Sequence, residues 1–264
     1  MSAWRLKIML ALTLPLAAAA AYGNAFFGSN PQPGYLQWSG FSDGSVGVTI
    51  NDPGLGVNNF SPNAGQFYGS FNPAAEGGGA TFGPDDFFRF FCVDITHSVS
   101  GSAITYTRSI PALDPTRSAE LTWLFDLYYP NKATGTYYSG GVQTNFGDFP
   151  NADTSAAFQV ALWEIWFDSG LSLSSGNFTA TSSDTTMINL AQGYLNAVGA
   201  ASGTPPTGWT FYEFSSGSDH CCQDYLSVEY SQTLHSTPEP DALLLFASAV
   251  IAAGVAALRR RQTA

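Results

Sequence analysis

The pattern of apolar and polar positions is strand-like near the start, helical in the middle and strand-like again near the end. Alternation between turn residues predicts short strands at Ser45–Ile50 and Gln66–Phe71. Phe87–Val99 is the clearest strand region, and Ile104–Ile110 follows it with interleaved polar residues. Because the turn residues Ser100-Gly101-Ser102 separate these two segments, we expect them to form a hairpin.

The middle of the chain carries three helical segments. Asp114-Pro115-Thr116 is typical of a helix start and predicts a helix over about 117–128. Two further helices are predicted over about 153–167 and 184–198. Strand-like sequence returns at Trp209–Phe214 and Tyr225–Tyr230. The expected fold class is therefore α+β, a β-sandwich or barrel with a helical part inserted near residues 114–199, in a β-rich domain over 22–231.

The first residues have the pattern of a secretory signal peptide. Arg5 and Lys7 precede an apolar stretch, Ile8–Ala21, which ends in a run of alanines. This order predicts a signal peptide over residues 1–21, with cleavage after residue 21 or as late as residue 25. An N-terminal membrane anchor is the alternative, and the short apolar stretch disfavours it.

The last residues have three parts in a fixed order. A linker begins near residue 232 and leads to Pro238-Glu239-Pro240. Residues 242–258 then carry no charge, and three arginines follow directly: Arg259, Arg260 and Arg261. At about 1.5 Å per residue, a helix of this length spans about 26 Å, close to the thickness of a hydrocarbon core. We predict a single transmembrane helix at 242–258 with the arginines on the cytoplasmic side.

These C-terminal elements resemble the PEP-CTERM sorting signal of Gram-negative, exopolysaccharide-producing bacteria. The resemblance covers about the last 27 residues, 238–264, and rests on the Pro-Glu-Pro motif, the short apolar helix and the arginine cluster. It implies an exosortase as partner, passage through the inner membrane, and sorting to the cell surface or a biofilm matrix. A plain single-span anchor with a chance Pro-Glu-Pro motif is the alternative.

Charge restricts the possible partners further. The 264 residues carry a formal net charge of −11, and only 11% of them are charged. Residues 22–237 hold 4 basic and 18 acidic residues, a net charge of −14. So few basic residues cannot neutralise a phosphate backbone, which excludes a typical nucleic-acid partner. We expect no catalytic residues, no cofactor and no metal, and we do not expect an enzyme.

Two polar residues stand out in apolar surroundings. Gln159 lies in the segment Ala156–Phe167, whose only other polar residue is Glu164. A helix this apolar is buried, and an unpaired buried amide costs about 1 to 3 kcal/mol. Cys92 lies in the aromatic strand region, and the adjacent Cys221 and Cys222 are too close for an unstrained mutual disulfide.

The surroundings of Cys92 and Gln159 resemble bacterial surface thioester domains. Phe91-Cys92-Val93-Asp94 is similar to that family's aromatic-Cys-aliphatic strand. Phe158-Gln159-Val160-Ala161-Leu162-Trp163 is similar to its Thr-Gln-x-Ala-Ile-Trp motif, with Phe158 in place of Thr. The resemblance implies an internal thioester between Cys92 and Gln159, which couples to an amine of a surface partner.

Other interpretations stay open. Cys92 can simply pack in the core while Gln159 bonds a backbone carbonyl. A disulfide from Cys92 to Cys221 or Cys222 would exclude the thioester. A non-covalent exopolysaccharide-binding or structural matrix protein is the alternative function.

Overall fold

A computed structural model describes residues 31–72, 87–131, 138–139, 142–143, 146–217 and 222–230. The predicted signal peptide, the linker and the whole C-terminal sorting segment lie outside these ranges and stay predictions. The same holds for the domain boundaries. Among the described helices, none has both the length and the apolarity needed to cross a membrane.

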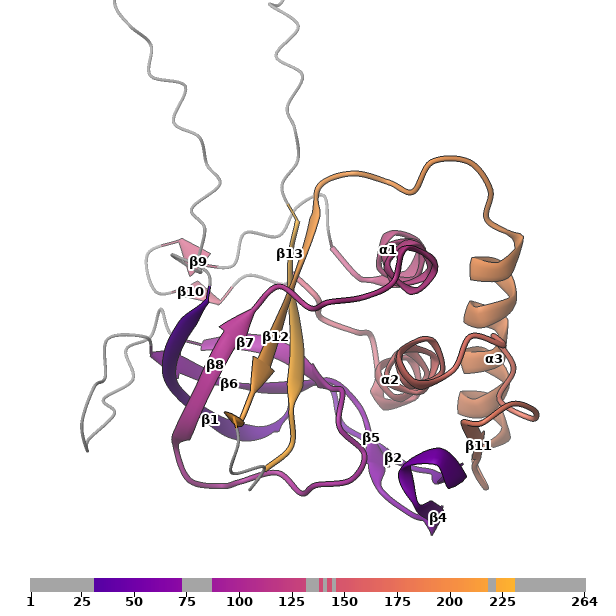
Figure 1. Cartoon of the computed structure of the whole chain (residues 1–264), viewed down its shortest axis with the longest axis horizontal. Helices are drawn as coiled ribbons and strands as arrows, with labels where there is room; N and C mark the ends of the chain where they lie inside the picture. Colours follow the sequence, from indigo (N-terminus) through magenta and orange to yellow (C-terminus); the bar gives the residue numbers. More distant parts are fainter. Residues whose placement is uncertain are drawn as a thin grey trace, which may run out of the picture.

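Six antiparallel strands form a closed barrel. Their order around it is β1, β6, β7, β13, β12 and β8, and each strand pairs with its two neighbours. In the same order, the strands span Gln32–Phe41, Phe67–Asn72, Phe87–Cys92, Tyr225–Tyr230, Trp209–Ser215 and Ile104–Ser109. Of the two predicted architectures, the barrel is the one observed (Figure 1).

Shorter strands lie outside the barrel. A three-stranded sheet has the order β11 (Thr179–Thr181), β3 (Thr49–Asp52) and β4 (Val57–Phe60). A 3-10 turn, η1 (Pro53–Leu55), joins β3 to β4. Two-stranded pairs are formed by β2 (Val46–Gly47) with β5 (Asn63–Ala64), and by β9 (Tyr138–Ser139) with β10 (Val142–Gln143).

Three helices follow one another between β8 and β12, as the predicted insertion required. They are α1 (Pro115–Tyr128), α2 (Ala152–Phe167) and α3 (Thr185–Ala200). Each begins at a polar cap whose side chain accepts backbone N–H bonds: Asp114, Asn151 and Asp184 respectively. The helices gather on one side of the barrel (Figure 1). The α+β expectation with a helical insertion is confirmed.

The predicted hairpin of Phe87–Val99 with Ile104–Ile110 is wrong. Strand β7 ends at Cys92 and pairs with β6 and β13, whereas β8 pairs with β1 and β12. After β7, the Val93 N–H donates to the Asp224 carbonyl, so the chain first follows the segment before β13. The Asp94 carboxylate then accepts from the Thr96 N–H and turns the chain away.

Strand β7 is buried on both of its faces, which explains its many aromatic residues. Phe90 packs inside the barrel against Phe67 and Tyr225, with ring centroids 5.8 and 4.8 Å away. Phe91 points the other way and contacts Phe158 of α2 at 5.0 Å. Both phenylalanines are 0% exposed. Burying each of them stabilises the fold by about 1.5 to 3 kcal/mol, so β7 links the barrel core to the helical layer.

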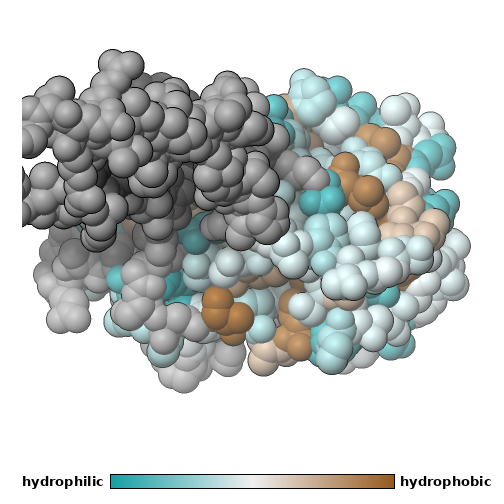
Figure 2. Space-filling view, turned by 90° about the horizontal axis from the view of Figure 1, so that it is seen from above, coloured by the Kyte–Doolittle hydropathy of each residue, from teal (hydrophilic) through white to brown (hydrophobic). Residues whose placement is uncertain are grey.

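On the face drawn in Figure 2, the described residues form no large apolar patch. Among the coloured residues there, apolar side chains form small separate groups between polar and pale residues. Four large apolar residues in the described ranges are exposed: Leu55, Phe60, Ile110 and Leu127. Scattered apolar residues of this kind are normal on a protein surface.

Gly69 supplies a test of the barrel geometry. It pairs with Trp38 of β1, and a Cβ atom at this position would collide with the Gln37 carbonyl. We expect Gly69→Ala to lower the free energy of unfolding by about 1 to 3 kcal/mol in urea denaturation. Gly101→Ala is the matched control, because a Cβ there meets nothing within 4 Å. Equal stability of the two variants would contradict the close β1–β6 approach.

Candidate functional site

The structure brings Cys92 and Gln159 together. Cys92 is the last residue of β7, and Gln159 lies in the middle of α2. The backbone N–H of Cys92 donates to Gln159 Oε1 at 3.0 Å, and Gln159 Nε2 donates to the Cys92 carbonyl at 2.9 Å. The carboxamide therefore pairs with the main chain of a single strand residue, 67 positions away in sequence.

Gln159 takes the position of a missing strand partner. In a strand, the backbone groups of residues i and i+2 point to the same side. Phe90 pairs on that side with Phe67, the first residue of β6. Because β6 begins at Phe67, this strand does not reach Cys92, two residues beyond Phe90. The N–H and the carbonyl of Cys92 therefore lack a partner in β6. The Gln159 amide has one acceptor and one donor group, so it satisfies both.

Trp163 strengthens the same junction. It lies one helical turn after Gln159, on the same face of α2. Its Nε1–H donates to the Cys92 carbonyl at 3.0 Å, so this oxygen accepts from both α2 side chains. Trp163 is 2% exposed. A buried indole N–H needs such a partner, and here the partner also fixes the height of α2 against β7.

The Cys92 thiol is buried and protonated. The residue is 1% exposed, and its Sγ lies 3.2 Å from the Asp94 carbonyl, to which it donates. Burial raises the pKa of the thiol far above its ordinary value, and hydrogen-bonding from the Asp94 backbone and the Trp163 side chain offsets this effect only in part. At neutral pH the group is therefore a thiol and not a thiolate, out of contact with bulk water.

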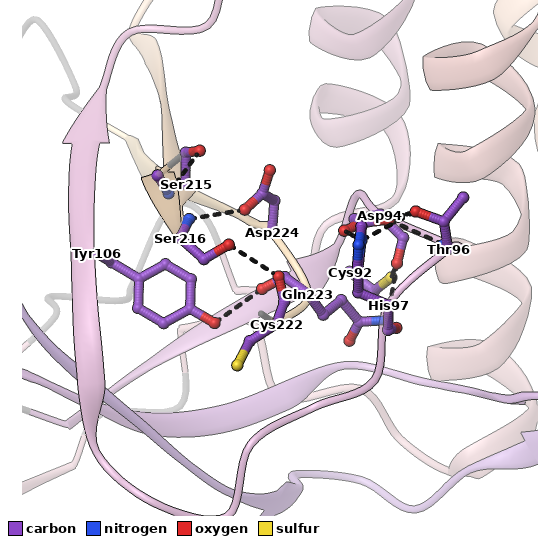
Figure 3. A network of polar contacts seen from close by, with 11 residues as sticks. Cys92, Asp94, Thr96, His97, Tyr106, Ser215, Ser216, Cys222, Gln223 and Asp224 are labelled. Carbon is purple, nitrogen blue, oxygen red and sulfur yellow. Dashed lines mark hydrogen bonds and ion pairs between the residues drawn. The ribbon is translucent and has the colours of Figure 1, made fainter. Parts of the chain in front are cut away.

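A polar turn covers the thiol side of the site (Figure 3). Burial would raise the pKa of Asp94, but hydrogen bonds from Thr96 and His97 outweigh it and lower that pKa below its ordinary value. His97 Nδ1 lies 2.6 Å from Asp94 Oδ2. Gln223, next to β13, donates from Nε2 to the Asp94 carbonyl at 2.9 Å. The turn is therefore tied to the segment that precedes β13.

The other cysteines do not pair with Cys92 in the described ranges. Cys92 and Cys222 are both buried, and no disulfide joins them. In Figure 3 the Cys222 sulfur points away from the Cys92 sulfur. Cys221 lies outside the described residues. The structure thus gives no support to a disulfide between Cys92 and Cys222.

Sequence reasoning identified Cys92 and Gln159 but not the residue that supports them. Trp163 belongs to the motif that resembles the thioester family, yet no role of its own was assigned to it from the sequence. The available signal was its spacing of four residues from Gln159, which places both side chains on one helical face. The motif residues of the C-terminal sorting signal lie outside the described ranges, so the structure does not place them.

Comparison with known proteins finds similar structures. No protein-family profile matches the sequence, and no curated protein matches it either. A solved structure of the N-terminal domain of the Streptococcus pyogenes pilus tip adhesin Cpa is 16% identical, covering 75% of this chain and 94% of that one, with a TM-score of 0.38. The N-terminal thioester domain of fibronectin-binding protein SfbI from the same species is 14% identical, covering 77% and 97%, with a TM-score of 0.40. The N-terminal thioester domain of a Clostridium perfringens surface protein is 14% identical, covering 70% and 99%, with a TM-score of 0.35.

Glu164 is a second unusual residue of α2. It is 0% exposed, and its Oε1 accepts the Ser172 N–H at 2.8 Å. Its Oε2 is buried without a partner. Burial raises its pKa from 4.5 to about 7, and the Ser172 bond offsets part of this, while the charges of Asp168 and Glu120 raise it further. The folded protein therefore holds a proton on Glu164 that the unfolded chain releases at lower pH.

This proton makes stability depend on pH. Because the folded pKa of Glu164 lies above the unfolded one, its contribution is fully present below pH 4.5 and is lost as pH rises toward about 7. We expect Glu164→Gln, which keeps an acceptor for Ser172, to gain about 1 to 3 kcal/mol relative to the unmodified protein between pH 4 and pH 8. Urea denaturation at both pH values measures this gain, and a constant difference would show that Glu164 is not protonated in the fold.

Proposed function

We propose that this protein is an exported surface or matrix protein that attaches covalently to an amine-bearing partner through a Cys92–Gln159 thioester. The observation that carries the proposal is the pairing of the Gln159 carboxamide with both backbone groups of Cys92. That pairing holds an acyl carbon beside a cysteine in a dry interior. Both side chains are buried, so neither forms part of the exposed surface.

The bond-forming step releases ammonia. The Cys92 sulfur attacks the Gln159 amide carbon, the C–N bond breaks, and the thiol proton leaves with the nitrogen as NH₃. The product is an S–C(=O) bond between the two side chains. The Cys92 N–H already donates to Gln159 Oε1. As negative charge grows on this oxygen, the same N–H stabilises it, as a backbone donor does in an oxyanion hole.

The thioester is then a stored electrophile. Water is kept away because Cys92 and Gln159 are 1% and 0% exposed, which slows hydrolysis. A lysine amine of a partner attacks the acyl carbon, forms an amide with Gln159 and returns the thiol to Cys92. The acyl-transfer logic is that of covalent catalysis, but each molecule reacts once, so the protein is not an enzyme.

Export and sorting form the second part of the proposal, and the sequence alone supports them. The signal-peptide pattern and the Pro238-Glu239-Pro240 motif with its apolar helix and arginine cluster favour passage through the inner membrane and recognition by an exosortase. The final location would be the cell surface or a biofilm matrix. An extracellular polysaccharide or an amine-bearing surface protein is the expected partner.

The alternative is a packed Cys92 with a hydrogen-bonded Gln159 and non-covalent adhesion. The two hydrogen bonds between Gln159 and Cys92, and the one from Trp163 to Cys92, would then serve only to join α2 to β7. The two possibilities differ by one covalent bond and one ammonia, so mass separates them.

The test is the intact mass of the exported chain, expressed in a host that exports it and purified without amines, read against the mass expected for its measured N-terminus. We expect the mass to fall short by one ammonia. Cys92→Ala and Gln159→Ala should each abolish the deficit. Methylamine should also remove it, by adding one methylamine to the protein and exposing one thiol to a maleimide reagent.

Two matched variants serve as controls. Cys222→Ala removes the other described buried cysteine, and Gln66→Ala removes a buried glutamine that bonds Tyr129 instead. Both should retain the ammonia deficit. A full mass in the unmodified protein, with Cys92 open to thiol reagents after denaturation, would overturn the covalent function. The sorting proposal would be unaffected, because it is tested separately by deleting residues 238–264 and locating the product.

A further inference from the structure

A groove of about 360 Å³ lies away from the Cys92 site. Three segments that are distant in sequence form it: the η1 turn after β3, the first turn of α1, and the C-terminal end of α2 with the loop that follows. The side chains that line it are Asp52, Leu55, Arg117, Trp166, Phe167 and Asn177. Neither Cys92 nor Gln159 lines the groove.

The groove combines an aromatic surface with polar groups that the fold does not use. Trp166 and Phe167 are half-buried, and Leu55 is 47% exposed. Arg117 makes one ion pair among the described residues, from Nε to Asp114 at 3.5 Å. Burial raises the pKa of Glu120, and the charge of Arg117 offsets part of this rise. No hydrogen bond of the terminal nitrogens of Arg117 occurs in these ranges. No side-chain hydrogen bond of Trp166 or Asn177 occurs in the described ranges, although many side chains nearby are bonded. The groove therefore offers unused donors and acceptors beside flat apolar rings.

Three aspartates hold the groove in shape. Asp52 accepts the Leu55 N–H at 3.1 Å and so fixes the η1 turn. Asp114 caps α1 and contacts Arg117. Asp168 ends α2 and accepts the N–H groups of Asn177 and Phe178, which fixes the loop after the helix. A site whose walls are already held in place loses little entropy when it binds a ligand.

The loop after α2 passes very close to the Asp168 side chain at Gly176. Its φ is +109°, and a Cβ atom there would collide with the Asp168 carboxylate. A left-handed glycine is therefore needed where the loop passes Asp168 before it presents Asn177. The position of the Asn177 side chain at the groove is thus built into the backbone.

We propose that this groove binds a neutral sugar ring of a polysaccharide. A pyranose has an apolar face that packs on an aromatic ring, and hydroxyls that both donate and accept hydrogen bonds. Trp166 and Phe167 supply the ring surface. Arg117, the Trp166 indole N–H and the Asn177 amide supply donors, and Asn177 and Asp52 supply acceptors.

Charge selects a neutral ligand over a charged one. The charged residues that line the groove are one acid, Asp52, and one base, Arg117, so their charges cancel, and Arg117 also contacts Asp114 at its rear. The protein as a whole has a net charge of −11 and repels anionic polymers. A cationic ligand would meet the unneutralised end of Arg117. Hydroxyl groups avoid both costs.

The proposal is independent of the thioester, since none of the groove residues contacts Cys92 or Gln159 through a hydrogen bond in the described ranges. The test uses the purified full-length chain in a detergent without a sugar headgroup. Its six tryptophans are labelled with ¹⁵N, and the indole N–H signals are followed by NMR while cellohexaose, maltohexaose or the anionic hexagalacturonate is added. Substitution of each tryptophan in turn assigns the signals.

We expect one neutral hexasaccharide to shift the Trp166 signal saturably, with half-saturation near or below about 1 mM. Trp166→Leu, followed by calorimetry, should weaken binding at least about tenfold. Asn177→Ala, which alters only an exposed side chain, should weaken it about threefold or more. Trp123→Leu is the matched control, because Trp123 lies on α1 and does not line the groove, and it should bind normally.

Three results would overturn the sugar site. The first is no shift of the Trp166 signal by either neutral sugar up to about 10 mM. The second is tighter binding of hexagalacturonate than of the neutral sugars. The third is binding that survives both Trp166→Leu and Asn177→Ala. Cys92→Ala should leave sugar binding unchanged, so failure of the thioester and failure of this site are observed separately.

Discussion

The pairing of one side-chain amide with one strand residue is the contact on which the arrangement of the domain depends. Gln159 makes the two hydrogen bonds with Cys92 that a neighbouring strand would make. These bonds hold α2 against β7 at a fixed height and rotation. Trp163 adds a second bond to the same carbonyl. Without these bonds, a buried N–H and a buried carbonyl would lack partners, at a cost of about 1 to 3 kcal/mol for each group. The packing of α2 and the pairing of β7 therefore both depend on the backbone of Cys92.

The helices were predictable because their signals are local. Asp114 and Asp184 cap α1 and α3 as their sequence positions suggest, and the strand over Tyr225–Tyr230 was anticipated with its observed bounds. Strand β1 was not anticipated, because Pro33, Gly34 and Gly40 interrupt its alternation. The hairpin error has a different origin. Which strands pair in a barrel depends on segments more than 100 residues apart, and the turn sequence near Gly101 carries no such information.

The two candidate sites differ in how far the sequence reveals them. Cys92 and Gln159 each sit in a short motif, and their apolar surroundings already indicate that an amide is buried there. The groove has no comparable motif. Leu55, Arg117 and Trp166 come from three separated segments, and each looks ordinary in its own context. Their meeting requires the caps at Asp52, Asp114 and Asp168, which are recognisable one by one but do not indicate a shared location.

The order of strands in the barrel also sets when the surroundings of Cys92 can form during synthesis of the chain. Strand β7 has β13 as one of its two neighbours, and Cys92 lies opposite Tyr225. Its partner strand β13 is the last one in the described ranges, so the surroundings of Cys92 are complete only after residue 230 has been synthesised. A contact of such high sequence separation forms late in folding. A chain that ends before residue 225 therefore lacks the strand beside Cys92, and its thiol is not enclosed as it is in the complete domain.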